Sequence, residues 1–523
     1  MSKTSLLQTL QQAYHLATLA NRWQIPPAEA LQRYQQQLIS RRQLFKASLM
    51  ATGALTAVAL HNQTTVAKEP KETVLIVGAG IAGLTAGYYL QQAGIPIRIV
   101  EASNRVGGRI RSQPQAVGTP KTIELGGEFI DSGHQTIRKL AQELGLEVVD
   151  LFASDTGLNS EIRWFEGKSI PASQLVTAFM PLAKQIAADV KAAGEVTYKS
   201  ANARAKKLDR LSISDYLQKY CPDPVLRHFI EVAYNNEYGL PVQQQSALNL
   251  LLLIGRDPAK LEIFGSSDQR YYIKGGNQQI TDRLAAKLAN FIETNTSLES
   301  IRSTPNGRYK VNSRQQGRSQ EQAYERVILA LPFSILRQIN VEVELPKVKQ
   351  AAIQELGYGT NTKLITGYRD RLWRTKYGSN GQVFGELNLL SETWESARYS
   401  SVNQGAIVNF TGGELGRKLA KTQPNIASRE FIADLQKIFP GVKDSYLDKS
   451  IITNWIDSPY SRGSYACYLV GQWTKFAGAE GERVKNLFFA GEHCSLEAQG
   501  YMEGGCGTGA AVAKEILADV KVK

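Results

Sequence analysis

The pattern of apolar positions is clearest over residues 73–101, where two short apolar runs frame a longer helical segment. Val74–Val77 is a continuous aliphatic run, typical of a strand that is buried on both faces. A helical pattern follows Gly83, and a second apolar run, Ile97–Val100, ends at Glu101. The pattern therefore predicts a complete β-α-β unit.

Three glycines follow the first predicted strand in G-x-G-x-x-G spacing. Gly78 would make the tight turn, Gly80 would let the backbone approach a pyrophosphate, and Gly83 would let the helix pack on the sheet. Glu101 ends the second strand, where an acid accepts both ribose hydroxyls and disfavours a 2′-phosphate. The residues predicted to hold the dinucleotide in this loop are Gly78, Ala79, Gly80, Ile81, Ala82 and Gly83.

The run EASNRVGGR at 101–109 resembles the extended dinucleotide signature of the FAD-dependent flavin amine oxidase superfamily. The resemblance implies that Arg109 reaches the FAD phosphates, a task that suits a planar guanidinium. The run ELGGE at 124–128 resembles the family's glycine-paired segment beside the flavin ring. Further cofactor contacts implied by these two runs are Ala102, Arg105, Gly108, Gly126, Gly127 and Glu128.

A second set of motifs lies near the C-terminus. The run NLFFAGE at 486–492, followed by GYMEG at 500–504 and a small-residue helix at 505–513, resembles the family's C-terminal FAD motif. The dipole of that helix would stabilise the anionic reduced flavin. Together with two positions elsewhere in the chain, the resemblance implies cofactor contacts by Leu298, Trp455, Gly491, Glu492, Gly500, Tyr501 and Met502.

The catalytic predictions also follow from the resemblance. Residues 455–465 resemble the flavin-facing segment of monoamine oxidases and put Tyr465 opposite Tyr501, where negative ring faces would steer an amine. Ser464 stands where those enzymes carry a cysteine bound to flavin, so FAD is expected to be non-covalent. Lys363 matches the family lysine that holds a water against flavin N5. Catalytic roles are thus expected for Lys363, Tyr465 and Tyr501, and substrate contacts for Glu128, Tyr465, Gly500 and Tyr501.

The substrate expected from the sequence is a basic L-amino acid such as L-arginine or L-lysine. Venom-type L-amino acid oxidases place a carboxylate-binding arginine soon after the glycine pair, whereas the first arginine here is Arg138. Glu128 and Asp131 could instead put negative charge near a cationic substrate. Other arginines that could contact the carboxylate are Arg256, Arg270 and Arg462.

The expected reaction yields a 2-oxo acid, ammonia and hydrogen peroxide, with oxygen or another acceptor taking the electrons. One alternative is a polyamine or monoamine oxidase, which would release an aldehyde. More remote alternatives are a carotenoid desaturase or protoporphyrinogen-type oxidase, which share the N-terminal motif, and a non-catalytic flavoprotein.

The expected fold is α/β: a discontinuous Rossmann-like FAD-binding domain, a mixed-sheet substrate domain and a helical insertion. A chain of 523 residues is long enough for at least two domains. The expected segments are 1–39, a polar helical extension; 40–71, an export signal and linker; 72–150, 269–345 and 451–523, the FAD-binding domain; 151–268, the helical insertion; and 346–450, the substrate-binding sheet.

The run SRRQLFK at 40–46 closely resembles a twin-arginine export signal. The apolar run 47–60 is too short to span a membrane and suits a signal core, and Thr65–Ala67 is a small-residue cleavage site. The segment before the arginine pair is unusually long for such a signal. The expected location is periplasmic or lumenal, and an uncleaved signal would tether the protein to a membrane. A homodimer is compatible with the sequence.

The charge pattern and the cysteine and histidine residues argue against two further kinds of function. The net charge is +13, but no basic run with interleaved aromatics suggests a nucleic-acid partner. The four cysteines form no CxxC pair, and the five histidines form no cluster, so no metal site is expected.

Overall fold

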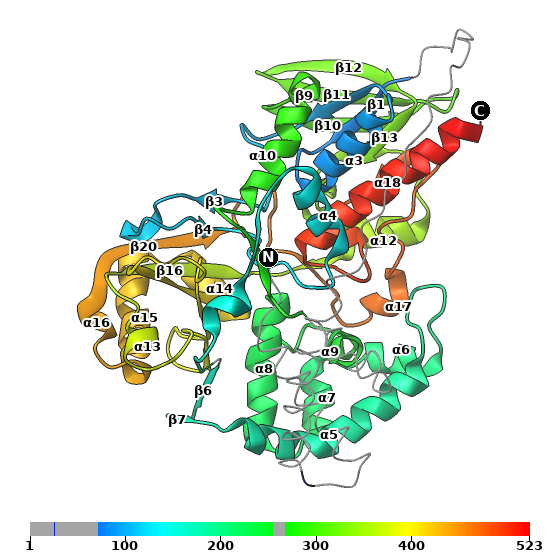
Figure 1. The fold of residues 1–523 in the computed structure, drawn as a ribbon. Coiled ribbons are helices and arrows are strands. Elements are labelled where there is room, and N and C mark those ends of the chain that lie inside the picture. The colour runs from blue at the N-terminus through cyan, green and yellow to red at the C-terminus, as the bar shows by residue number, and fades with distance from the viewer. Residues whose placement is uncertain (1–25, 27–71, 160, 255–266, 523) are drawn as a thin grey trace, which may run out of the picture.

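A computed structural model describes residue 26 and residues 72–159, 161–254 and 267–522. The predictions for the polar extension, for the twin-arginine segment and for Arg256 lie outside these residues. Figure 1 shows three regions: a layered α/β region at the top, a mixed sheet at the left and a group of helices below.

The α/β region is built on a parallel five-stranded sheet, and the predicted β-α-β unit is confirmed at its centre. The strand order is β22 (Leu487–Phe489), β13 (Arg326–Leu329), β1 (Val74–Val77), β2 (Ile97–Val100) and β9 (Ile292–Glu293). Helices α3 (Ile81–Gln92) and α18 (Met502–Val522) lie side by side on one face, with α4 (Gln135–Glu143) and α10 (Gln278–Lys287) beside them (Figure 1).

Alternate residues of β1 enter two different cores, as a strand buried on both faces requires. Val74 and Ile76 pack with apolar residues of α3, α10 and α18, whereas Leu75 and Val77 pack with those of a second sheet. That sheet has the order β12 (Arg318–Tyr324), β11 (Tyr309–Gln315), β10 (Thr296–Ser303) and β14 (Asn340–Glu342). The nucleotide-type sheet is therefore covered on both sides.

The substrate region contains a mixed seven-stranded sheet. Its order is β20 (Tyr446–Asn454), β16 (Thr362–Tyr368), β19 (Gly405–Thr411), β18 (Glu392–Glu395), β17 (Val383–Gly385), β6 (Ile162–Phe165) and β7 (Lys168–Ser169). The segment boundary expected at 450/451 falls within β20, because pairing with β16 continues to Asn454. Strands β6 and β7 lie within residues 151–268, the segment expected to be helical. They belong instead to the substrate sheet, because β6 pairs with β17.

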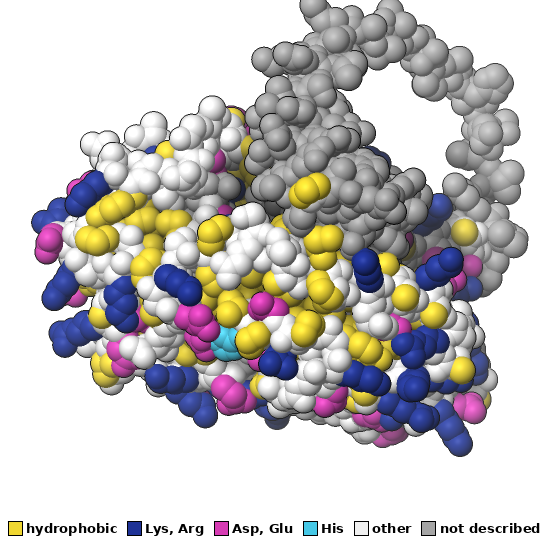
Figure 2. Space-filling model, turned by 90° about the horizontal axis from the view of Figure 1, so that it is seen from below, with side chains coloured by type: hydrophobic (Ala, Val, Ile, Leu, Met, Phe, Trp, Pro, Cys, Tyr) yellow, Lys and Arg dark blue, Asp and Glu magenta, His cyan; other side chains and the backbone are white. Residues whose placement is uncertain are grey.

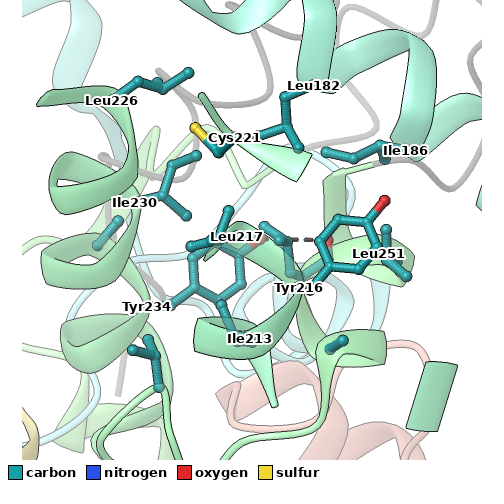
Figure 3. Packing of buried hydrophobic residues seen from close by; sticks show 14 of the residues in the cluster. Leu182, Ile186, Ile213, Tyr216, Leu217, Cys221, Leu226, Ile230, Tyr234 and Leu251 are labelled. Atoms are coloured by element: carbon teal, nitrogen blue, oxygen red, sulfur yellow. Dashed lines mark hydrogen bonds between the residues drawn. The ribbon is translucent and has the colours of Figure 1, made fainter. Parts of the chain in front are cut away.

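The helices of residues 172–254 share one apolar core. They are α5 (Ala172–Ala193), α6 (Ala203–Asp209), α7 (Ile213–Tyr220), α8 (Pro224–Tyr238) and α9 (Ala247–Ile254). Figure 3 shows side chains from four of them, such as Leu182, Leu217, Ile230 and Leu251, meeting in this core. Helix α5 ends at Ala193, where Gly194 follows with φ 62°. A capping box of Ser212 and Asp215 begins α7.

Shorter elements connect these regions. The strands are β3 (Ser112–Gln113), β4 (Ile123–Glu124), β5 (Val148–Asp150), β8 (Tyr271–Ile273), β15 (Gly357–Tyr358) and β21 (Ala466–Cys467). The helices are α11 (Phe333–Leu336), α12 (Lys347–Glu355), α13 (Leu372–Thr375), α14 (Gly413–Ala420), α15 (Pro424–Ile438), α16 (Val442–Ser445) and α17 (Gln472–Phe476). The 3₁₀ turns are η1 (Ala116–Gly118), η2 (Leu151–Asp155), η3 (Ala289–Phe291) and η4 (Glu492–Cys494).

The surface, the helices and the metal-binding residue types add one observation each. On the face seen from below in Figure 2, Lys and Arg side chains are spread among acidic and apolar ones. Among the described residues, no helix has the length and apolarity needed to cross a membrane. The same part of the chain holds no group of three or more side chains suited to binding a metal ion.

Candidate active site

A cavity of about 880 Å³ lies where β1, β2, β13 and β22 end. The carboxyl edge of a parallel sheet is where α/β folds bind nucleotides. The predicted cofactor residues that line this cavity are Gly78, Gly80, Ile81, Ala82, Glu101, Ala102, Arg105, Gly108, Arg109, Leu298, Trp455, Gly491, Glu492, Gly500, Tyr501 and Met502. The predicted residues outside the lining are Ala79, Gly83, Gly126, Gly127 and Glu128.

The glycine loop fits the three roles predicted for it. Gly78 has φ 105°, and a Cβ there would lie 2.6 Å from the Ala330 carbonyl oxygen. A Cβ on Gly83 would lie 2.0 Å from the carbonyl oxygen of Gly78, so α3 can approach the sheet only through glycine. In contrast, a Cβ on Gly80 would meet nothing within 4 Å. Gly80 therefore faces open cavity, where a phosphate can approach the backbone.

Glu101 connects the glycine loop to the segment after β2. Its Oε2 accepts a hydrogen bond from the Ala79 amide at 2.8 Å, and its Oε1 accepts bonds from the Ser103 amide and hydroxyl at 2.9 and 2.7 Å. The carboxylate also lines the cavity. These contacts fix the position of the acid that was predicted to meet the ribose hydroxyls.

Arg109 and Glu492 form an ion pair of 2.9 Å across the cavity wall. Arg109 also donates to the Ser464 carbonyl at 2.7 Å, and Glu492 accepts from the Gly500 amide at 2.8 Å. Burial alone would raise the pKa of Glu492, but the charge of Arg109, the neighbouring His493 and the hydrogen bonds from Arg109 and Gly500 together lower that pKa. The pair joins the N-terminal and C-terminal motifs, which are 383 residues apart.

Tyr465 and Tyr501, the two aromatic residues predicted to flank the amine, both line the cavity. The Tyr465 hydroxyl donates to the Glu237 carbonyl at 2.5 Å, and the Tyr501 ring lies edge-on to His134 at 4.9 Å. Burial, together with nearby carboxylates including Glu237, raises the pKa of each tyrosine well above 10. Both therefore remain un-ionised phenols at neutral pH.

Lys363 lies in β16, and its ammonium has three protein acceptors. Its Nζ donates to the carbonyls of Gly126 and Glu124 at 2.9 and 3.1 Å and to Glu128 Oε2 at 2.8 Å. An ammonium carries three protons, so a water would have to replace one of these contacts or share a proton. Its water-holding role stays a prediction.

The predicted acidic residues are engaged with protein groups. Glu128 pairs with Lys363, and its Oε1 accepts from the Ser396 hydroxyl at 2.9 Å. Asp131 accepts from the Ser267 hydroxyl at 3.0 Å and the Gln269 amide at 2.8 Å. The charge of Glu128 is thus largely neutralised by Lys363, which weakens the idea that it attracts a cationic substrate directly.

Of the predicted carboxylate-binding arginines, the two that the structure describes, Arg270 and Arg462, do not line the cavity. Arg270 pairs with Asp150 at 2.7 Å, and Arg462 is exposed. A different arginine, Arg398, is buried; it also lies outside the cavity lining, and its Cζ is 5.6 Å from the centre of the Phe129 ring. No local pattern indicated Arg398, because it comes from a loop of the substrate region without a motif of its own.

Other lining residues were missed as well. They include Ser103, Asn104, Gly107, Thr296, Ser297, Ala330, Leu331, Pro332, Ile335, His493 and Gly505. Ala330, Leu331 and Pro332 directly follow β13 of the parallel sheet. Their position at a strand end was the signal that could have identified them.

The residues present fit FAD. Gly80 provides an uncovered backbone approach, Arg109 supplies a cation, and the buried ring of His493 lines the cavity with both nitrogens lacking a hydrogen-bond partner. Among the described residues no cysteine lines the cavity, and the Ser464 hydroxyl donates to Asn361 at 2.7 Å. The fold and site together define a flavoprotein oxidoreductase with a dinucleotide-binding domain of Rossmann type.

The family follows from comparison with known proteins. The profile described as "Flavin containing amine oxidoreductase" matches residues 81–517, so the chain belongs to that family, whose cofactor is FAD. Amine oxidase [flavin-containing] A of Sus scrofa is 24% identical over 464 residues, covering 85% of this chain and 84% of the relative. Amine oxidase [flavin-containing] B of Cavia porcellus is 26% identical over 479 residues, covering 85% of this chain and 86% of the relative.

Solved structures share the fold. Putrescine oxidase bound to putrescine superposes with a TM-score of 0.73 at 21% identity, covering 86% of this chain and 99% of the other. Cyclohexylamine oxidase from Brevibacterium oxydans IH-35A has a TM-score of 0.73 at 20% identity, covering 86% and 100%. The predicted FAD-dependent amine oxidase is therefore confirmed at the level of family and fold.

Proposed function

We propose that this amine oxidase deaminates a basic L-amino acid to the 2-oxo acid, ammonia and hydrogen peroxide, with oxygen as electron acceptor. The observation that carries the proposal is the acidic surrounding of the two cavity tyrosines. The pKa of Tyr465 is raised first by burial and then by Glu237 and Glu392, and that of Tyr501 by burial and then by Asp131 and Glu237. Such a surrounding favours a substrate with a second positive charge.

FAD, when bound, would supply the two-electron acceptor for the α C–H bond of the substrate. Tyr465 and Tyr501 hold the neutral amine between their ring faces. Their hydroxyls stay protonated, so neither ring carries a charge that would hold the amine as ammonium. The imine product then takes up water and releases ammonia.

Arg398 is our candidate for the substrate carboxylate. Its side chain packs on Phe129, the residue after Glu128, and its Nε lies 2.9 Å from Asp155 Oδ2. It belongs to a buried group in which four cations face two carboxylates: Lys121, Arg371, Arg374 and Arg398 with Asp155 and Glu395. This excess of positive charge would favour an anionic group nearby.

A diamine or polyamine that yields an aldehyde is the second candidate. The carboxylates around the tyrosines suit it equally, and the names of related proteins include amine, putrescine and cyclohexylamine oxidases. It differs from the first candidate only in lacking the α-carboxylate.

Two matched substrate pairs separate the candidates: L-lysine with cadaverine, and L-arginine with agmatine. Each pair differs only in the carboxylate. We expect the amino acids to give faster peroxide formation than their decarboxylated partners and to yield a 2-oxo acid. In Arg398→Met, KM should rise for the amino acid of each pair but not for its decarboxylated partner. Preference for the decarboxylated partner would move the assignment to the second candidate, and turnover of neither would contradict both.

We also propose export by the twin-arginine route to a periplasmic or lumenal location, on the strength of residues 40–46. Replacing both Arg41 and Arg42 with Lys should leave the protein in the cytoplasmic fraction. Unchanged fractionation would contradict this route.

A further inference from the structure

The Lys363 ammonium is held by one short segment of the chain, residues 124–128. Two of its three acceptors are main-chain carbonyl oxygens of this segment, that of Glu124 at 3.1 Å and that of Gly126 at 2.9 Å. The third acceptor is the carboxylate of Glu128, at the end of the same segment. The ammonium therefore has a defined position only while residues 124–128 keep their conformation.

Asn277 binds both ends of this segment. Its main-chain amide donates to Glu124 Oε1 at 2.8 Å, and its Nδ2 donates to the carbonyls of Gly127 at 3.1 Å and Glu128 at 2.6 Å. The side chain is itself oriented, because its Oδ1 accepts from the Ile273 amide at 3.0 Å. Asn277 is 0% exposed, so these hydrogen bonds are not shared with bulk water.

The position of Asn277 in the chain would favour a different use of its side chain. Asn277 is the N-cap residue of α10, and an asparagine at an N-cap usually accepts a hydrogen bond from the first turn of its helix. Here the side chain makes no hydrogen bond that caps α10. It is turned instead toward residues 124–128, and those contacts take the place of a helix cap.

The Glu124 carboxyl group fixes the first residue of the segment. It is 0% exposed and accepts from the hydroxyls of Ser112 at 2.8 Å and Tyr272 at 2.9 Å, in addition to the amide of Asn277. Leu125 lines the cofactor cavity, whereas Glu124, Tyr272 and Asn277 do not. The three residues lie behind the cavity wall, and the segment connects them to it.

We propose that Asn277 and Glu124 are positioning residues for Lys363, and that they act through the main chain of residues 124–128. Without the Asn277 side chain, the carbonyls of Gly127 and Glu128 lose the donor that fixes their direction. The Lys363 ammonium then loses its defined set of acceptors. This effect on Lys363 holds whichever amine is the substrate, whereas its consequence for the reaction with oxygen rests on the proposed oxidase function.

The first test observes the Lys363 ammonium directly in the full-length protein. A buried ammonium exchanges its protons slowly, so lysines labelled with ¹⁵N at Nζ give separate NMR signals, and the signal missing in Lys363→Met belongs to Lys363. We expect Asn277→Ala to shift or broaden the Lys363 signal. The signal of Lys121, which is buried and paired with Glu395, should not change.

Gln245→Ala is the matched control. Gln245 is also buried, and its Nε2 likewise donates to two main-chain carbonyls, those of Tyr234 at 2.8 Å and Leu240 at 2.6 Å. Its removal should lower stability without changing the Lys363 signal. A Lys363 signal that shifts as much in Gln245→Ala as in Asn277→Ala would reduce the effect to general destabilisation and overturn the proposal.

Tyr272→Phe covers the case in which Asn277→Ala does not fold. It removes one of the hydrogen bonds to Glu124 and keeps the aromatic ring. We expect a smaller change of the Lys363 signal in the same direction. An unchanged Lys363 signal in whichever of the two variants folds would overturn the proposal.

The second test measures the consequence for the reaction with oxygen. Holoenzyme reduced with dithionite and then mixed with oxygen needs no amine, so the choice of substrate does not affect the result. We expect Asn277→Ala to slow reoxidation by about tenfold, because a small displacement of Lys363 is enough to impair its action. Asn277→Ala/Lys363→Met should be no slower than Lys363→Met, because both substitutions act on the same ammonium.

Reoxidation of Asn277→Ala at the unsubstituted rate would overturn the positioning role in this reaction. Additive losses in the double variant would also contradict it, because they would show that Asn277 acts independently of Lys363. Failure of every amine to reduce the flavin would instead contradict the proposed function, and the reoxidation rates would still be measurable.

Discussion

At the scale of single residues, the pair of Lys363 and Glu128 connects stability with the proposed chemistry. The two charges are 2.8 Å apart, and both side chains are at most 3% exposed. Removing one member of a buried pair leaves an uncompensated charge, which costs about 3–5 kcal/mol. Replacing both members with uncharged side chains avoids that cost.

We therefore predict that Lys363→Met lowers the free energy of unfolding by about 3 kcal/mol or more. The double variant Lys363→Met/Glu128→Gln should recover much of this loss in denaturant titrations. Both variants should reoxidise reduced flavin slowly if Lys363 assists the reaction with oxygen. A double variant less stable than Lys363→Met would contradict the buried-pair interpretation, and unchanged reoxidation would remove the proposed catalytic role.

The structure brings residues of the predicted motifs together, whereas their roles stay predictions. Arg109, Glu492, Tyr465 and Tyr501 come from segments far apart in the chain, yet all line one cavity. Each lies within a motif whose backbone conformation fixes the direction of its side chain. The pairing of Glu128 with Lys363 and the burial of Arg398 depend on how separate loops pack, which no local pattern encodes.

At the scale of elements, two glycines at the junction of β1 and α3 have different surroundings. A side chain on Gly83 would collide with the backbone of Gly78, whereas one on Gly80 would point into open cavity. Gly80 has φ −73°, which any residue can adopt. Substitution of each glycine should therefore affect a different property.

We predict that Gly83→Ala destabilises the apoprotein by about 3 kcal/mol or more, because α3 must move away from the sheet. Gly80→Ala should leave the apoprotein melting temperature nearly unchanged but weaken FAD binding. Thermal melts of apoproteins and fluorescence titrations with FAD measure the two effects. A melting temperature lowered equally by both substitutions would contradict the distinction.

The elements of the β-α-β unit could be predicted from their periodicity, and β1 and β2 match the expected runs. Domain assignment was harder, because strands β6 and β20 pair with partners that are distant in sequence. Neither strand carries a sequence feature that specifies its partner. Within the predicted helical insertion, the end of α5 coincides with Gly194, which has a positive φ.

At the scale of the whole molecule, buried carboxyl groups make stability depend on pH. Burial raises the pKa of Glu480 from 4.5 to about 7, although hydrogen bonds from Tyr468 and Gly478 oppose this shift. Between pH 4.5 and 7 the folded state therefore binds more protons at this site than the unfolded state. The contribution of Glu480 to the unfolding free energy falls as pH rises through this window, by up to about 3 kcal/mol.

Glu480→Gln is uncharged at every pH and should remove this contribution. We predict that the variant gains about 2–3 kcal/mol relative to the unsubstituted protein between pH 5 and pH 8. Urea unfolding at the two pH values measures the change. Glu344→Gln, which replaces an exposed carboxylate, is the control and should give a pH-independent difference. A stability difference between Glu480→Gln and the unsubstituted protein that does not change with pH would contradict the raised pKa of Glu480.

The central claim is that this FAD-binding chain oxidises amines at the tyrosine pair, and anaerobic mixing tests it most directly. Holoenzyme mixed with L-arginine or L-lysine in the absence of oxygen should lose its oxidised-flavin absorbance, and Tyr465→Phe/Tyr501→Leu should slow this loss. Loss of absorbance with cadaverine or agmatine alone would keep the amine oxidase and change its substrate. Absorbance that persists with every amine and amino acid would contradict the catalytic account and favour a non-catalytic flavoprotein.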